Sequence, residues 1–264
     1  MSTRVEAHPD RTLAAKRGLF SALARVAGHR TMKGLVSRYM APDRPALALA
    51  MGESLVRAPR RVLALTAHPD DLEFFAGGTL HRMALAGSQI HAVVMTDGEK
   101  RGNWTDLGGR RRSEQQEAAR FQGYHSVRFM GLPDFGLPED PRLERLVART
   151  WAEISPEVVF AFDPKELLPQ TANRDHKALG RTVMDIARAK LHTGVQVYFY
   201  GTHHPVVLVD ISIVMAEKLR AVKAHQSQMV FLDEQETNET IRSMGRMAAG
   251  AGGCAYAEPW YRLL

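Results

Sequence analysis

The chain has 264 residues, 45% of them hydrophobic and 24% charged, which is typical of one large globular domain or two small ones and excludes a disordered, collagenous or coiled-coil chain. Its 35 basic and 29 acidic residues leave a net charge of +6, and because no stripe of basic and aromatic residues is present we expect no nucleic-acid partner. No apolar run reaches the roughly 18 residues of a transmembrane helix, and the single Cys254 excludes an internal disulfide framework, so we expect a cytoplasmic protein.

The first 60 residues differ in composition from the rest of the chain. They are basic and rich in alanine, and residues 11–27 place apolar side chains at helical spacing. We expect a partly helical extension that packs on the domain or on a partner. A helix lying on a membrane surface is the alternative, so peripheral membrane contact stays open. We place the boundary between the extension, 1–60, and the main domain, 61–264, at this change of composition.

From residue 61 onward, short apolar segments alternate with helical patterns. We expect five strands, at 62–67, 90–95, 126–130, 158–162 and 195–200. The helical patterns begin at residues 79, 111, 143 and 176, and two further helices are expected after Asp210 and Thr237. Strands that are apolar throughout and alternate with helices indicate a mainly parallel sheet covered on both faces. We therefore predict a single three-layer α/β/α domain with a Rossmann-like sheet.

The sharpest chemical signal follows the first expected strand, and ligands gather at the carboxyl ends of such strands. The segment from His68 to Glu73 contains one imidazole and three carboxylates, two of them the adjacent Asp70 and Asp71. A divalent cation would relieve the repulsion among these carboxylates, and zinc binds both histidine nitrogen and carboxylate oxygen. A group of helix-capping residues is the alternative, and the residue types alone do not decide between the two.

Two later segments carry side chains of the same kind. Residues 173–176 read Asn-Arg-Asp-His, where a neutral His176 at the start of a helix suits a metal ligand and Asp175 could orient a neighbouring ring. Residues 218–228 contain His225 near the end of another helical pattern. The alternatives are a capped helix start for the first segment and the polar end of a surface helix for the second.

Taken together, the motifs resemble the PIG-L/LmbE-like family of zinc-dependent N-deacetylases. HPDDLEFFAGGT at 68–79 is similar to the family signature. Further landmarks follow in the family's order: TDGE at 96–99, RxxE at 111–114, GLPD at 131–134, DHKALG at 175–180, VDI at 209–211, KxxAxxxHxSQ at 218–228 and YAEPW at 256–260. The resemblance covers residues 61–264, and the first 60 residues have no counterpart in it.

The resemblance implies an enzyme that removes an N-acetyl group from a small amino-sugar-containing molecule, such as a glycoside, a glycolipid or a thiol-cofactor precursor. It implies that His68, Asp71 and His176 bind one Zn²⁺ per chain, although another divalent metal stays open. It also implies that Asp70 is the general base and that His225 stabilises the oxyanion or supplies a proton. A homo-oligomer also stays open.

The resemblance further implies that Arg111 and Asp134 contact the substrate. Asn173 stands where family members carry a histidine three residues before the last metal ligand, and we group it with the substrate-binding residues. Two alternatives stay open, and the departure at Asn173 supports only the second of them. One is an amidase that acts on a different amide, such as a thiol conjugate. The other is an impaired homologue that binds metal and glycan without turnover.

Overall fold

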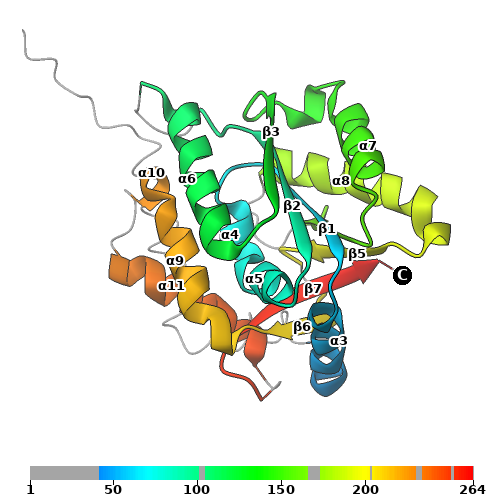
Figure 1. Cartoon of the computed structure of the whole chain (residues 1–264), viewed down its shortest axis with the longest axis vertical. Helices are drawn as coiled ribbons and strands as arrows, with labels where there is room; N and C mark the ends of the chain where they lie inside the picture. The colour runs from blue at the N-terminus through cyan, green and yellow to red at the C-terminus, as the bar shows by residue number, and fades with distance from the viewer. Residues whose placement is uncertain are drawn as a thin grey trace, which may run out of the picture.

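A computed structural model describes residues 42–100, 105–165, 173–202, 204–229, 234–250 and 253–263. Within these residues a central sheet lies between two sets of helices, which makes the three-layer arrangement that the sequence predicts (Figure 1). The helix expected at 11–27 lies outside the described residues. None of the described helices is both long enough and apolar enough to cross a membrane.

The sheet has seven strands in the order β3-β2-β1-β4-β5-β7-β6. Neighbours from β3 to β5 pair in parallel, whereas β7 is antiparallel to both β5 and β6. The five expected strands are confirmed to within two residues, and β6 and β7 were not predicted. The strands are β1 (Arg61–Thr66), β2 (Gln89–Thr96), β3 (Ser126–Leu132), β4 (Val158–Phe162), β5 (Gln196–Tyr200), β6 (Val207–Asp210) and β7 (Ala257–Leu263).

Nine helices and three short 3-10 turns connect these strands within the described residues. In Figure 1, α4, α5, α6 and α9 lie on one side of the sheet, and α7 and α8 lie on the other. The helices are α3 (Pro45–Arg57), α4 (Asp71–Phe75), α5 (Gly77–Leu85), α6 (Leu107–Gln122), α7 (Leu143–Ile154), α8 (Arg174–Lys190), α9 (Met215–Ala224), α10 (Gln226–Met229) and α11 (Glu234–Ala249); the turns are η1 (Leu137–Glu139), η2 (Leu191–Thr193) and η3 (Ser212–Val214).

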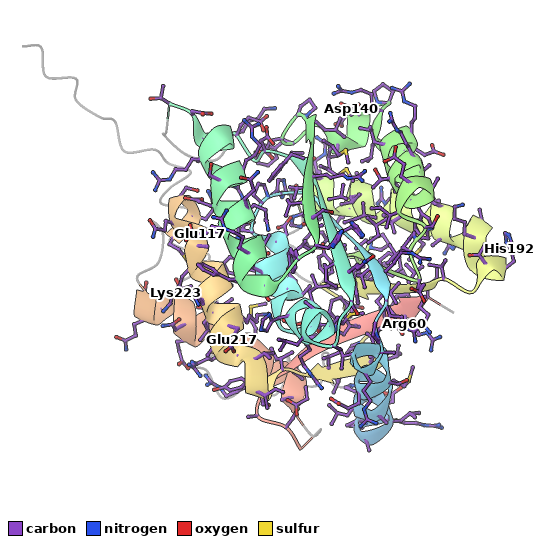
Figure 2. All side chains as sticks on the ribbon, in the orientation of Figure 1. Arg60, Glu117, Asp140, His192, Glu217 and Lys223 are labelled. Carbon is purple, nitrogen blue, oxygen red and sulfur yellow. The ribbon has the colours of Figure 1, made fainter. Side chains whose placement is uncertain are left out.

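The central strands are apolar throughout because both of their faces are buried. Successive side chains of a strand point to opposite faces. In β1, Val62 and Ala64 lie in the core under α5 and α9, whereas Leu63 and Leu65 lie in the core under α7 and α8. The outer faces of the helices are polar, and Figure 2 shows Glu117 of α6 and Glu217 of α9 at the outer surface.

The C-terminal strand is tied to the helices by a buried ion pair. Glu258 of β7 accepts hydrogen bonds from the backbone N–H groups of Gly78 and Thr79 at the start of α5, at 2.9 and 2.7 Å. Its carboxylate also accepts from Lys218 Nζ at 2.5 Å, and Lys218 donates to the carbonyl oxygen of Phe74 as well. Both charges are therefore paired and hydrogen-bonded, as burial requires. Two motifs noted in the sequence, those of Lys218 and Glu258, thus hold α4, α5, α9 and β7 together.

Helix α3 belongs to the part of the sequence that we assigned to the N-terminal extension, but it packs on the sheet. Its Leu55 and Val56 are buried in the same core as Val62 of β1. At Gly52 the helix comes so close to β6 that an added Cβ atom would lie 1.9 Å from the carbonyl oxygen of Leu208. A domain boundary at residue 60, as the composition predicts, would therefore assign α3 to a different unit from the sheet on which it packs.

We expect Gly52→Ala to lower the free energy of unfolding by roughly 1–3 kcal/mol or more, because the added methyl group must push α3 away from the backbone of β6. Chemical denaturation would measure the effect. Ser54→Ala, an exposed change on the same helix, is the control and should change stability by less than about 0.5 kcal/mol. If the two variants unfold alike, α3 does not contribute to the stability of the domain.

Candidate active site

The expected site residues meet at the point where the strand order of the sheet reverses. From β1 the chain continues toward β2 and β3 on one side, whereas β4 and β5 lie on the other side. The segment 68–71 follows β1, and the segment 173–176 lies at the start of α8, after β4. Ligands of open α/β sheets bind at such a reversal. Two segments about a hundred residues apart in the sequence are thereby brought together.

Asp71 is fixed by the end of β1. One of its carboxylate oxygens, Oδ2, accepts a hydrogen bond from the Thr66 hydroxyl at 2.9 Å and another from the His68 backbone N–H at 2.8 Å. Its other oxygen, Oδ1, lies 3.3 Å from His176 Nε2. The carboxylate is therefore held in one orientation by its own strand while it faces the other segment of the site.

His176 is placed by the close approach of α8 to β4. Its ring stacks on Phe162, with ring centres 3.7 Å apart and an angle of 9° between the planes. One turn further along α8, a Cβ atom at Gly180 would lie 2.5 Å from the Phe162 carbonyl oxygen. Only glycine leaves room for this approach. Gly180 thus explains why the last residue of β4 can support the imidazole of His176.

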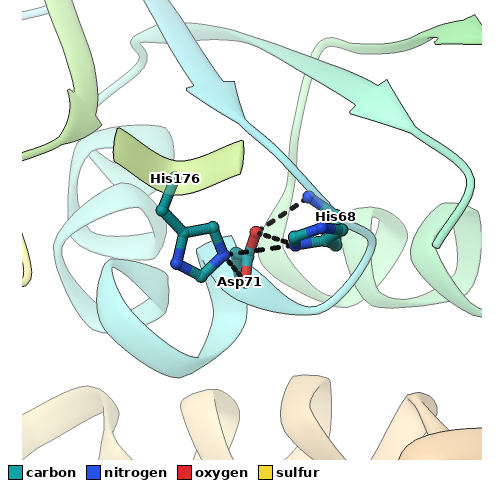
Figure 3. Close-up of side chains that lie close together, drawn as sticks. All are labelled: His68, Asp71 and His176. Atoms are coloured by element: carbon teal, nitrogen blue, oxygen red, sulfur yellow. Dashed lines mark hydrogen bonds and ion pairs between the residues drawn. The ribbon is translucent and has the colours of Figure 1, made fainter. Parts of the chain in front are cut away.

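His68, Asp71 and His176 form a triangle of ligand atoms (Figure 3). His68 Nδ1 lies 3.2 Å from His176 Nε2 and 3.4 Å from Asp71 Oδ2, and His176 Nε2 lies 3.3 Å from Asp71 Oδ1. Ligands about 2.05 Å from a tetrahedral zinc ion would lie about 3.3 Å from one another. All three side chains are buried. The two contacts of Asp71 end on different oxygens, but one donor atom from each residue lies within 4.8 Å of the other two, so the three side chains could hold one such ion.

The far side of the His68 ring is held by two buried carboxylates. Nε2 lies 3.1 Å from Asp134 Oδ1 and 3.3 Å from Asp175 Oδ2. Asp175 already accepts hydrogen bonds from the backbone N–H groups of Phe135 and Leu137, so it is fixed in place. These carboxylates favour the tautomer with hydrogen on Nε2 and leave Nδ1 free for a cation. His68, Asp134 and Asp175 could form a second ligand set, but the backbone bonds to Asp175 favour an orienting role.

The electrostatics of the triangle are dominated by these close contacts. Burial lowers the pKa of the His68 imidazole, but hydrogen bonds with Asp134, Asp175 and Asp71 outweigh burial and raise that pKa well above its ordinary value. Burial raises the pKa of Asp71, but His176 and His68 outweigh it and hold that pKa well below its usual range. The site therefore holds a positive charge strongly, and a metal cation can take the place of the proton.

Asp70 lies beside the triangle and has an unusual backbone conformation. Its φ angle is 109°, a value that residues other than glycine rarely adopt, and such strain is concentrated at functional sites. Burial raises the pKa of the Asp70 carboxyl, Arg111 lowers it, Asp71 raises it, and the net shift is upward. A carboxylate whose pKa is raised is a better proton acceptor near neutral pH.

Arg111, an expected substrate contact, is buried and bonded to the loops after β1 and β2. Its guanidinium donates to the carbonyl oxygens of Gly98 and Pro69, at 3.0 and 2.5 Å, and to Asp70 Oδ2 at 3.1 Å. Only 3% of the residue is exposed. The structure therefore gives Arg111 a role in fixing Asp70, and a direct contact with substrate stays a prediction.

The other two expected substrate contacts also face His68. Asp134 is fully buried behind the ring, as described above. Asn173 Nδ2 lies 3.4 Å from His68 Nε2, and its Oδ1 accepts a hydrogen bond from the backbone N–H of Asp175 at the start of α8. Asp134 therefore supports the His68 ring, whereas Asn173 holds the start of α8 through its bond with Asp175. Contact of either residue with a substrate stays a prediction.

His225 does not join the triangle. Its ring is fully buried, and Nε2 lies 3.1 Å from Glu73 Oε2. Glu73 Oε1 in turn accepts a hydrogen bond from Gln115 Nε2 at 3.0 Å. The expected action of His225 on the oxyanion or the leaving amine stays a prediction. Sequence reasoning missed Gln115, since one glutamine in a polar helix carries no pattern that distinguishes it.

The fold and the site define a doubly wound α/β protein with a buried triangle of side chains that could hold a cation where the order of its sheet reverses. The model of the PIG-L family, described as GlcNAc-PI de-N-acetylase, matches residues 63–187. The diacetylchitobiose deacetylase of Thermococcus kodakarensis is 29% identical over 189 residues, which cover 64% of this chain and 70% of the relative. Over residues 63–187, just under half of its length, the chain is therefore similar to the PIG-L family.

Two solved structures resemble the whole domain. The N,N'-diacetylchitobiose deacetylase of Pyrococcus horikoshii superposes with a TM-score of 0.70 at 23% identity, covering 98% of this chain and 95% of that one. The conserved protein TT1542 of Thermus thermophilus has a TM-score of 0.65 at 30% identity, covering 78% and 95%. Because its identity is only 23%, the Pyrococcus horikoshii structure shows similarity of fold alone. The predicted three-layer fold and the resemblance to this family are both confirmed.

Proposed function

We propose that this protein is a zinc-dependent hydrolase that removes the N-acetyl group from a small amino-sugar-containing molecule. The observation that carries the proposal is the cluster of His68, Asp71 and His176, whose donor atoms lie close enough to hold one ion, beside Asp70 with its strained backbone. Similarity over residues 63–187 to a family described as GlcNAc-PI de-N-acetylase, and similarity to a diacetylchitobiose deacetylase, support the substrate class.

Each residue of the site has a task in amide hydrolysis. The ion would be held by His68, Asp71 and His176. It would act as a Lewis acid that polarises the amide carbonyl and lowers the pKa of water. Asp70 takes the proton of the attacking water and can return it to the departing amine. Asp134 and Asp175 keep the His68 ring in the tautomer that binds the ion.

The direct test combines metal analysis with product detection. We expect the purified protein to contain one zinc ion per chain and to release acetate from some members of a panel of N-acetylglucosaminides. The panel should include an N-acetylated thiol conjugate without a sugar, and N-acetylglucosaminides with different aglycones. Release from the thiol conjugate alone would favour the amidase alternative. Tight metal and glycan binding with no acetate, even in a single turnover, would favour the impaired homologue.

Arg111 gives a prediction about pH. Burial raises the pKa of Asp70, and the Arg111 cation lowers it, so removing that cation should raise the pKa further. Asp70 acts as a base only above its pKa, so the acid limb of the kcat/KM profile of Arg111→Gln should move to higher pH. Arg111→Lys, which keeps the charge, should show the smaller shift. An acid limb that is unmoved or displaced to lower pH in Arg111→Gln would contradict the assignment of that limb to Asp70.

A further inference from the structure

Asp70 is held from one side by a single helix. Arg111 and Gln115 stand one turn apart on the buried face of α6, and both reach the same strained peptide. Arg111 binds the carboxylate of Asp70 at 3.1 Å and the preceding carbonyl oxygen of Pro69 at 2.5 Å. Gln115 Oε1 accepts the backbone N–H of Asp70 at 3.0 Å. Helix α6 therefore holds both the backbone N–H and the side-chain carboxylate of Asp70.

The orientation of the Gln115 amide is itself determined by buried neighbours. Its Nε2 donates to Glu73 Oε1 at 3.0 Å, and Glu73 Oε2 bonds to His225 Nε2 at 3.1 Å. Gln115, Glu73 and His225 are all fully buried. A carboxylate only accepts hydrogen bonds, so the amide nitrogen of Gln115 must face Glu73 and its oxygen must face the N–H of Asp70. The hydrogen bonds that run from His225 through Glu73 to Gln115 therefore end on the backbone N–H of Asp70.

We propose that Gln115 is a positioning residue that holds the peptide of Asp70 in the conformation required for proton transfer, with Glu73 and His225 fixing the Gln115 amide. The proposal rests on the proposed function, in which Asp70 is the base. A residue at φ 109° relaxes unless its surroundings hold it, and the N–H of Asp70 is one of the two points at which α6 holds it. Gln115 touches no ligand atom of the triangle, so metal binding does not depend on it.

The test is Gln115→Met, which keeps the length and burial of the side chain but removes both hydrogen bonds. We expect kcat to fall about 10- to 100-fold, because a base that is misplaced by even about 1 Å loses rate on this scale. KM and metal content should stay within about twofold of the wild-type values. A second readout does not need activity: hydrogen exchange of the Asp70 amide should become faster, whereas that of the core strands should not.

The same helix provides two matched controls. Gln116→Met is the same substitution at the adjacent, exposed position. Gln122→Met is the same substitution at a fully buried position, where neither polar side-chain atom has a hydrogen-bond partner among the described residues. Neither residue contacts Asp70 or the triangle through any described hydrogen bond. Both variants should keep wild-type kcat and wild-type exchange at Asp70.

Exchanging the side chains of Gln115 and Glu73 gives a sharper test than Gln115→Met alone. In Gln115→Glu, two carboxylates would face each other across the 3.0 Å contact with Glu73, and kcat should fall. Combining Gln115→Glu with Glu73→Gln restores every bond in reverse, since the new carboxylate accepts from the Asp70 N–H and from the new amide, and that amide accepts from His225. We expect the double variant to recover at least tenfold in kcat over Gln115→Glu and to recover protection of the Asp70 amide.

The proposal is wrong if Gln115→Met keeps kcat and Asp70 exchange at the values of Gln122→Met, or if it loses its metal. A rise in KM at unchanged kcat would also overturn it, because that result would make Gln115 a binding residue. If the wild-type protein releases no acetate from any substrate, the proposed function fails. The exchange measurement still decides whether Gln115 holds the Asp70 peptide.

Discussion

Replacing His176 with alanine is expected to abolish metal binding and hydrolysis together. The triangle offers three protein ligands, the number typical of a catalytic zinc site, so the loss of one leaves two. Loss of a mere orienting partner costs roughly 10–100-fold in metal affinity, so loss of a ligand should cost more. Zinc content after dialysis and acetate release measure the two effects. Asp71→Ala and His68→Ala should behave in the same way.

A matched control for these variants is His91→Ala. His91 bonds to Ser126 on the outer part of the sheet and is not part of the triangle. Its substitution should leave zinc content and kcat unchanged. Full zinc retention in His176→Ala would remove His176 from the ligand set and would leave the arrangement of His68 with Asp134 and Asp175 as the candidate.

Asp70→Asn should separate catalysis from metal binding. Asparagine keeps the size of the side chain and tolerates positive φ, but it cannot accept the proton. We expect near-normal zinc content and a kcat lowered by roughly 10²–10⁴-fold, with loss of the acid limb of the pH–rate profile.

Asp71→Asn is the natural counterpart of this variant. An amide oxygen is a poorer ligand for zinc than a carboxylate, so zinc should be lost first and activity with it. If Asp70→Asn lost its metal while Asp71→Asn kept it, the roles of the two neighbours would be exchanged.

The parallel part of the sheet could be predicted because burial on both faces leaves a clear pattern. The segments that became β1, β2 and β4 are almost uninterrupted apolar runs, and α5 and α7 between them each bury apolar side chains at helical spacing. The carboxyl ends of such strands lie at one edge, so polar residues at 68–71 and 173–176 could be expected to approach one another. These two segments lie far apart in the sequence, but the parallel topology alone predicts that they approach one another.

The antiparallel part of the sheet carried no such signal. β7 contains Glu258, Pro259 and Arg262, and a proline argues against an inner strand because it cannot donate to the ladder. Pro259 nevertheless lies opposite Leu208 of β6. The buried carboxylate of Glu258 is compensated by Lys218 and by the backbone N–H groups of Gly78 and Thr79. These compensations come from distant parts of the chain, and a local pattern does not contain them.

The site was predicted to different depths. The ligand set and the role of Asp70 were implied by the resemblance to the family, because the residue types alone left a metal site and a group of helix-capping residues equally open, and these roles stay predictions. The burial of Arg111 and His225, and the contact of Gln115 with the Asp70 backbone, depend on how α6 and α9 lie against the segment after β1. A glutamine that binds a backbone N–H can stand at any polar helical position, so only the three-dimensional arrangement distinguishes Gln115 from Gln116.

The position of β7 between β5 and β6 has a consequence for biosynthesis. Among the described strands β6 pairs only with β7. Val207–Asp210 therefore cannot join the sheet until Ala257–Leu263 has been synthesised. The same late strand supplies Glu258 to the start of α5, which follows the metal-binding segment after β1. A nascent chain that lacks the last described strand therefore exposes an unpaired strand edge, with the attendant risk of aggregation. We expect C-terminally truncated forms of this protein to depend on chaperones and to be degraded.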